Sequence, residues 1–164
     1  EIKMDNKYTV GIITASDKGS KGEREDISGR RIKELLPAEK YEVVSYKVLP
    51  DEQTELEQEM IRLSDTCGCN LILTTGGTGF SLRDVTPEAT LAVIEREIRA
   101  IPVAMWVEGL KITPRAMLSR AAAGTRGSTL IVNLPGSEKG ARENLTAILG
   151  ALGHGLRMLG GEGH

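Results

Sequence analysis

Three glycines and a threonine, GGTG at residues 76–79, form the strongest chemical signal in the sequence. They directly follow NLILTT at residues 70–75, a short apolar segment that is typical of a buried strand. Because glycine has no side chain, such a run lets backbone N–H groups surround a phosphate. A flexible turn between a strand and a helix has a similar composition. The position directly after a buried strand, where α/β proteins bind their ligands, favours phosphate binding.

Asp84 lies five residues after this glycine loop (residues 76–79). In proteins, Mg²⁺ is usually held by one or two carboxylates together with phosphate oxygens, so Asp84 is a candidate metal ligand. The alternative is a solvated residue before a helix that opens at Thr86, because the N-terminus of a helix favours negative charge. Beside a phosphate-binding loop, we favour the metal role.

Asp51 follows a second candidate strand at residues 41–49 and precedes a helical pattern that carries Leu56. As an N-cap, it would stabilise that helix by about 1 kcal/mol. Its place at the carboxyl end of a strand is the reason to consider a catalytic role instead. The spacing alone leaves both interpretations open.

Small polar residues also follow the other candidate strands. Ser16 and Asp17 come after the first strand, where they either bind a polar ring or turn the chain. NLPGS at residues 133–137 either presents backbone groups to a flat heterocycle or forms a Pro-Gly turn. Ser119 and Arg120 either bring a cation to an anionic ligand or lie on a solvated helix face.

Two common nucleotide motifs are absent from the sequence. No G-x-G-x-x-G follows the first candidate strand, and GSEKG at residues 136–140 lacks the G-K-[ST] that closes a P-loop. The chain is therefore neither a standard dinucleotide binder nor a P-loop NTPase. Cys67 and Cys69 are too few for a zinc site and are expected to be reduced thiols. Trp106, in an apolar run, is expected in the core or at an oligomer contact rather than at a cofactor.

The elements that must position these residues are predicted from the apolar patterns. Strands are expected at residues 8–15, 41–49, 70–75 and 128–134, the second nearer an edge because its residues alternate. Helices are expected around Ile32 to Leu36, from Leu56 to Leu63, from Thr86 to Ile98, at residues 101–112 and 116–123, and from Glu138 onward. Thr86, Thr113 and Ser137 are the expected N-caps, whereas Gly150, Gly153 and Gly155 either permit close packing of the last helix or break it. Residues 17–26 are expected to form a mobile polar loop.

Strands that alternate with helices predict an α/β fold with a mostly parallel sheet covered on both faces. The carboxyl ends of its strands meet at one edge, so the polar residues above would face a common ligand. With 164 residues, no internal repeat and no linker-like stretch, residues 1–164 are expected to form one domain.

Composition excludes several partners. The net charge is −2 and aromatic residues make up 3% of the chain, so we expect no nucleic-acid partner. No apolar run reaches the roughly 20 residues that span a bilayer, and residues 1–7 do not resemble a signal peptide. We therefore expect a cytoplasmic protein without a membrane partner.

Taken together, these motifs resemble the molybdopterin adenylyltransferase family of molybdenum cofactor biosynthesis, over about residues 8–159. The residues that carry the resemblance are LPDE at 49–52, TTGGTG at 74–79, RDVTPEAT at 83–90, SR at 119–120, NLPGS at 133–137 and TASD at 14–17. The resemblance implies a three-layer α/β domain with a mainly parallel sheet, usually a homotrimer. It also implies Mg²⁺-dependent transfer of AMP from ATP to the terminal phosphate of molybdopterin, with release of pyrophosphate.

The resemblance further assigns roles to residues. Asp51 and Asp84 would be the catalytic carboxylates, with Asp84 as the metal ligand. The nucleotide and pterin groups would be held by Gly76, Gly77, Thr78, Gly79, Asn133, Pro135, Gly136 and Ser137, with Ser16, Asp17, Ser119 and Arg120 near the same pocket. Molybdopterin and ATP are the expected small-molecule partners, and other cofactor-biosynthesis proteins are candidate partners.

One stretch departs from the family pattern Pro-Gly-x-x-Glu-x-x-Arg. Val103 replaces the acidic residue and Trp106 replaces the basic one. Two alternatives remain, a nucleotide pyrophosphatase of similar fold and a non-catalytic pterin-binding or scaffold module. The lone Asp84 after Arg83 disfavours the first, and the presence of both Asp51 and Asp84 disfavours the second.

Overall fold

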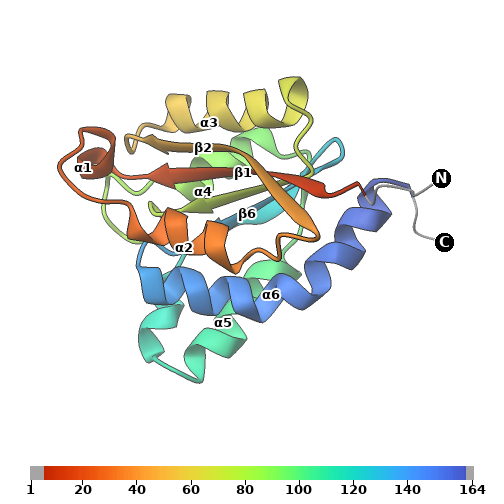
Figure 1. Cartoon of the computed structure of the whole chain (residues 1–164). Helices are drawn as coiled ribbons and strands as arrows, with labels where there is room; N and C mark the ends of the chain where they lie inside the picture. The colour runs from red at the N-terminus through yellow and green to blue at the C-terminus, as the bar shows by residue number, and fades with distance from the viewer. Residues whose placement is uncertain (1–5, 162–164) are drawn as a thin grey trace.

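The computed structural model describes residues 6–161, which form a mixed six-stranded sheet with helices on both faces (Figure 1). The strand order is β2-β1-β3-β6-β5-β4. The strands are β1 (Tyr8–Ala15), β2 (Tyr41–Leu49), β3 (Leu71–Thr75), β4 (Arg96–Glu97), β5 (Ala123–Arg126) and β6 (Thr129–Leu134). The first four in spatial order are parallel, whereas β5 pairs antiparallel with β6 and β4 pairs antiparallel with β5. The mostly parallel α/β fold and the edge position of β2 are confirmed.

Helices lie in two layers, one on each face of the sheet (Figure 1). One layer contains α3 (Gln53–Ile61), which continues into the π-helix η1 (Arg62–Thr66), and α4 (Thr86–Val93). The other contains α2 (Ile27–Leu35), α5 (Ala100–Leu110) and α6 (Glu138–Leu159). Two short helices complete the chain: α1 (Asp17–Ser20) follows β1, and the 3₁₀ helix η2 (Pro114–Leu118) follows α5. The three-layer arrangement agrees with the resemblance.

Alternating strand residues supply the two halves of the core, because successive side chains of a strand point to opposite faces. Leu71 and Leu73 of β3 pack in the cluster that includes α2, α5 and α6. Ile72, between them, packs in the cluster that includes α3 and α4. All three are fully buried, so β3 lies at the centre of the fold and carries the glycine loop from a rigid position.

Two predicted helical segments are wrong, and one cause accounts for both. The helix expected from Thr86 to Ile98 ends at Val93, because the N–H groups of Glu95 and Ile98 donate to β5 carbonyls at 2.8 and 2.9 Å. The helix expected at residues 116–123 does not form. The 3₁₀ helix η2 ends at Leu118, and β5 begins at Ala123. Strand β5 pairs with β6, and β4 pairs with β5, so the ends of both segments are drawn into an antiparallel extension of the sheet.

The predicted helix caps are confirmed at two of three positions. Ser137 accepts from the N–H of Gly140 at 3.0 Å, and Thr113 accepts from the N–H of Arg115 at 3.2 Å. Thr86 is itself the first helical residue, so its hydroxyl does not cap α4. Helix α6 is continuous through its three glycines, and the predicted polar loop contains the helix α1.

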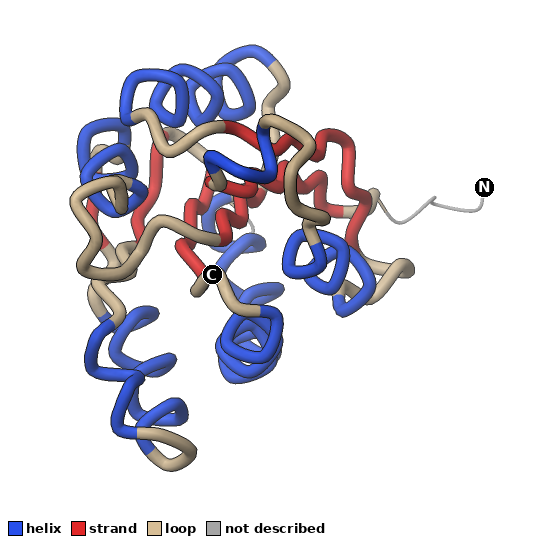
Figure 2. The backbone as a smooth tube through the Cα atoms, turned by 90° about the vertical axis from the view of Figure 1, so that its left-hand side faces the viewer, coloured by secondary structure: helices blue, strands red, loops and turns tan. Residues whose placement is uncertain are grey.

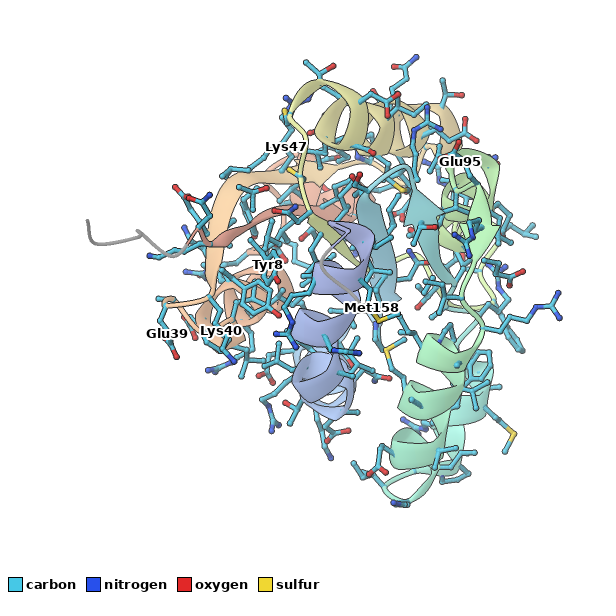
Figure 3. The ribbon with its side chains drawn as sticks, turned by 90° about the vertical axis from the view of Figure 1, so that its right-hand side faces the viewer. Tyr8, Glu39, Lys40, Lys47, Glu95 and Met158 are labelled. Carbon is cyan, nitrogen blue, oxygen red and sulfur yellow. The ribbon has the colours of Figure 1, made fainter. Side chains whose placement is uncertain are left out.

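The two ends of the sheet differ. At the amino ends of the strands, shown in Figure 3, Tyr8 lies near the turn of Glu39 and Lys40, and its N–H donates to the Lys40 carbonyl at 2.8 Å. Figure 2 shows the opposite end, where loops follow the carboxyl ends of the parallel strands. The predicted site residues lie at this second end. No helix among the described residues has the length and apolar character needed to cross a membrane.

Candidate functional site

The glycine loop follows β3 in a conformation that requires glycine at two positions. Gly76 and Gly77 have φ of 91° and 69°, in the left-handed region that residues with a side chain rarely adopt. A Cβ at Gly76 would collide with the carbonyl of Ala15, and a Cβ at Gly77 would collide with the hydroxyl of Thr86. The loop therefore winds tightly between the end of β1 and the start of α4, with its backbone close to both.

Asp51 and Asp17 bond to each other's backbone. The N–H of Asp51 donates to Asp17 Oδ1 at 3.0 Å, and the N–H of Asp17 donates to Asp51 Oδ2 at 3.1 Å. Arg83 then donates to both carboxylate oxygens of Asp17, at 2.9 and 3.1 Å, and to Glu52 at 2.8 Å. These bonds join the segments that follow β1, β2 and the glycine loop, which lie far apart in the sequence.

The interpretation of Asp51 as a helix cap is wrong. Helix α3 begins at Gln53 with Glu52 at the cap position, and no side chain bonds its first turn. Among the residues that the structure describes, Asp51 Oδ1 is instead buried without a hydrogen-bond partner, and so is the hydroxyl of Thr86. Both oxygens lie beside Gly77. Buried, unpartnered polar atoms are unusual and point to a ligand or a functional role.

Burial sets the electrostatics of this pair of carboxylates. The pKa of Asp51 is raised, first because burial penalises the charged form, and further because Asp17 and Asp84 are negative. The pKa of Asp17 is lowered, first because Arg83 donates hydrogen bonds to its carboxylate. The site therefore holds one carboxylate that resists ionisation next to one that is stabilised as an ion.

Asp84 lies beside Gly79, the last residue of the glycine loop. Its Oδ2 accepts from the N–H of Ser81 at 3.0 Å, and a Cβ at Gly79 would come within 2.9 Å of the same oxygen. Within residues 6–161, no group of three His, Cys, Asp or Glu side chains could hold a metal ion by itself. Carboxylate oxygens are nevertheless the donors that Mg²⁺ prefers, and Mg²⁺ commonly completes its shell with phosphate oxygens and water.

A cleft with two lobes surrounds these residues. The α1 lobe, of about 590 Å³, is lined by residues that include Ser16, Asp17, Asp51 and Gly76. The α5 lobe, of about 580 Å³, is lined by residues that include Thr78, Gly79, Trp106, Ser119 and Pro135. The lining residues that the two lobes share are Gly77, Asp84, Gly136 and Ser137. Twelve of the fourteen predicted site residues thus line one lobe or both; the exceptions are Asn133 and Arg120.

Asn133 does not face the cleft. Its side chain is fully buried, donates to the hydroxyls of Thr74 and Thr90 at 2.9 and 2.8 Å, and accepts from the N–H of Ala122 at 3.0 Å. Every polar atom of its amide is used inside the protein. The Asn133 side chain therefore joins β6 to β3, α4 and the segment before β5, and none of its polar atoms is left for a ligand. A ligand contact from the Asn133 backbone stays a prediction.

Arg120 has a similar bracing role. Its guanidinium donates to the carbonyls of Gly79 and Asp84 at 2.7 and 2.8 Å and pairs with Glu88 at 2.6 Å. Its own N–H donates to the Thr78 carbonyl at 2.8 Å. The cation therefore holds the glycine loop in shape rather than projecting into the cleft.

Three further residues build the site, and the sequence patterns assigned none of them a role in it. Thr75 and Ser28 donate to the carbonyls of Pro135 and Gly136 at 2.6 and 2.7 Å, so they fix the turn that separates the two lobes. Arg83 was noted only as a neighbour of Asp84. Its position in a segment that follows the glycine loop was the available signal, because loops at this edge of the sheet converge.

Trp106 lies at the wall of the cleft and not in the core. It is half-buried, it belongs to neither buried cluster in the described part of the chain, and it lines the α5 lobe. The expectation of a core position is therefore wrong.

Comparison with known proteins identifies the family. A family model described as a probable molybdopterin binding domain matches residues 11–154. A molybdopterin adenylyltransferase from Helicobacter pylori is 40% identical over 159 residues, covering 93% of this chain and 88% of its own. The chain belongs to the molybdopterin adenylyltransferase family. A second member, from Escherichia coli, is 38% identical over 152 residues, covering 91% of this chain and 77% of its own.

A solved structure supports the fold of the family. The molybdopterin biosynthesis enzyme MoaB from Thermus thermophilus is 47% identical and superposes with a TM-score of 0.89, covering 94% of this chain and 97% of its own. The resemblance carried by the glycine loop, Asp84 and NLPGS is thereby confirmed.

Proposed function

We propose that the protein transfers AMP from ATP to the terminal phosphate of molybdopterin and releases pyrophosphate, as a step of molybdenum cofactor biosynthesis. The observation that carries the proposal is the cleft, whose two lobes share Gly77, Asp84, Gly136 and Ser137. A phosphorylated substrate in each lobe would bring two phosphates together at this shared wall. The names of the family members support the adenylyl transfer.

The proposed reaction needs no nucleophilic side chain. A phosphate oxygen of molybdopterin attacks the α-phosphorus of ATP, a new P–O bond forms, and the bond to the bridging oxygen breaks as pyrophosphate leaves. Positioning and charge neutralisation supply most of the rate of such a transfer. The glycine loop and the N-terminus of α6 both reach the shared wall, where the backbone N–H groups of such a loop and of a helix N-terminus would attract an anion.

We further propose Mg²⁺ as the cofactor, with Asp84 as its protein ligand. The fit rests on the donors in the site, because Asp84 and the unpartnered Oδ1 of Asp51 are hard oxygen donors at the wall of the cleft. When bound, Mg²⁺ would neutralise phosphate charge and stabilise the leaving pyrophosphate. Asp51, held by Asp17, would place a second carboxylate oxygen beside Gly77.

Assembly and compartment follow as lesser proposals. Both core clusters pack on one sheet, which supports a single domain over the described residues 6–161. Helix α5 leaves Val103, Val107 and Leu110 about half exposed, and these apolar side chains support a homotrimer contact. We also propose that the protein is located in the cytoplasm, where ATP is available. Other cofactor-biosynthesis proteins are the proposed source of the pterin.

The test is a product balance. Given Mg²⁺, ATP and molybdopterin, the protein should form adenylated molybdopterin and pyrophosphate in equal amounts, measured by chromatography. Without the pterin, ATP should remain almost unconsumed. Steady hydrolysis of ATP or of a nucleotide-sugar diphosphate without pterin would replace the transferase with the pyrophosphatase alternative.

A further inference from the structure

Trp106 supplies the only aromatic side chain that lines either lobe of the cleft, among the residues that the structure describes. It projects from α5, one turn before Gly109, which also lines the α5 lobe. A Cβ at Gly109 would come within 2.9 Å of the Ala116 Cβ, so this helix and η2 approach closely and form one side of the lobe. The indole is thus held in a wall built by two packed elements.

The protein leaves part of the indole surface of Trp106 uncovered. Trp is the largest apolar side chain, and burying its surface is worth more than burying that of any aliphatic residue. Yet Trp106 joins neither core cluster in the described part of the chain and is only half-buried. A planar ring placed on the indole would cover this surface, and ring-on-ring stacking accepts any flat heterocycle.

The rest of the α5 lobe suits a molecule that has both a ring and phosphates. Ile112, Leu118 and Pro135 add apolar surface beside Trp106. Arg115 and Lys139 add two cations against the carboxylates of Asp84 and Glu143, and Lys139 pairs with Glu143 at 3.9 Å. No salt bridge engages Arg115 within residues 6–161. The lobe therefore offers an apolar platform, the cation of Arg115 and the shared wall at Asp84 in one cavity.

The α1 lobe differs from the α5 lobe in its aromatic lining and in its charge. Its lining contains no aromatic residue within the described chain. It contains the carboxylates of Asp17, Glu25, Asp26, Asp51, Asp84 and Glu138 against the two cations Lys18 and Arg24. A heterocycle in the α1 lobe would be held by polar groups, so only the α5 lobe provides a stacking surface.

We infer that Trp106 is a substrate-binding residue whose indole stacks on the planar heterocycle of one of the two substrates, in the α5 lobe. The inference deepens the proposed function and rests on it, because both adenine and pterin are planar heterocycles attached to phosphates. It also gives the departure at position 106 a physical meaning: a cation that would attract phosphate is replaced by a surface that holds a ring.

The single tryptophan makes a direct test possible, because all indole emission comes from residue 106. ATP with Mg²⁺, molybdopterin, and tripolyphosphate as a probe without a ring are titrated separately, so that no turnover occurs. Excitation at the red edge of the indole band avoids adenine. We expect the substrate that stacks on Trp106 to change the emission saturably and tripolyphosphate to leave it unchanged.

A bound pterin also quenches indole from a distance, so fluorescence alone does not show which substrate stacks on Trp106. Affinities measured by calorimetry distinguish adenine from pterin. Trp106→Ala should raise the Kd of either ATP or molybdopterin by on the order of tenfold or more and leave the other Kd unchanged. Trp106→Phe keeps a ring and should restore most of the affinity. Val107→Ala, on the exposed face of the same helix, is the control and should leave both Kd values unchanged.

Wild-type affinity of Trp106→Ala for both substrates would overturn the inference. An equal loss for both substrates, or the same loss in Val107→Ala, would also overturn it and assign Trp106 to a subunit contact. The proposed function can fail while the inference holds. In that case the wild-type protein binds both substrates and Trp106→Ala weakens the binding of only one, but no adenylated pterin forms. If the wild-type protein binds neither substrate, both are rejected.

Discussion

At the scale of single residues, the carboxylate of Asp51 is held with one oxygen bonded and the other buried without a partner. Burial and the negative charges of Asp17 and Asp84 raise its pKa. A group whose pKa is raised in the folded state binds protons more tightly there than in the unfolded chain. Its ionised form therefore lowers the stability of the protein at neutral pH.

We expect Asp51→Asn to melt at the same temperature as the wild type or higher at neutral pH, and to lose most transfer activity. The Asn carbonyl can still accept from the N–H of Asp17, and a neutral amide removes the penalty that burial places on the charged carboxylate. The difference in melting temperature should shrink as the pH falls toward about 3.9, where the unfolded Asp also gains its proton. Calorimetry across pH and an adenylation assay check both expectations, and normal activity would remove Asp51 from the catalytic set.

Asp84→Asn tests the proposed metal ligand. The Asn oxygen can keep the bond from the N–H of Ser81, so the loop should persist and the melting curve should change little. Loss of the charge that faces Mg²⁺ should lower the transfer rate by about 100-fold or more. The rate is measured as Mg²⁺ is varied, and a variant with wild-type turnover at low Mg²⁺ would contradict the metal role.

At the scale of elements, the glycine loop owes its shape to positive φ at Gly76 and Gly77 and to the bonds from Arg120. Gly77→Ala should destabilise the protein by about 1–3 kcal/mol, because Ala must adopt a strained backbone and its Cβ meets Thr86. The same substitution at Gly150, an exposed helical site with no heavy atom near the new Cβ, should stabilise by about 0.5–1 kcal/mol. Denaturant unfolding measures both values, and equal effects would show that the loop conformation is not the cause.

Sequence patterns predicted the parallel strands and long α6 well, because these are long, apolar and dominated by local periodicity. They failed at residues 94–98 and 116–123, where pairing with β6 through β5 decides the structure and no local pattern reports it. The same holds for the site. The loops that follow strands were identified from sequence, but the reciprocal bonds of Asp17 and Asp51 and the inward turn of Asn133 depend on distant residues.

At the scale of the whole molecule, we expect a homotrimer that uses the exposed apolar residues of α5. Val103→Glu and Val107→Glu together should shift the mass measured by light scattering from three protomers toward one, because they place charge on an apolar surface. The circular dichroism spectrum should stay unchanged, which separates dissociation from unfolding. A wild-type protein that is monomeric at micromolar concentration would contradict the expectation.

The wall shared by the two lobes has a thermodynamic consequence. Two anionic substrates that meet at Gly77 and Asp84 repel each other, so occupancy of one lobe should weaken binding in the other. Linkage makes this penalty reciprocal: ATP must raise the Kd of molybdopterin by the same factor by which molybdopterin raises the Kd of ATP. The factor should shrink with added Mg²⁺, and titrations of each substrate with a non-reactive ATP analogue measure it. Identical affinities with and without the second ligand would mean that the lobes act as independent sites.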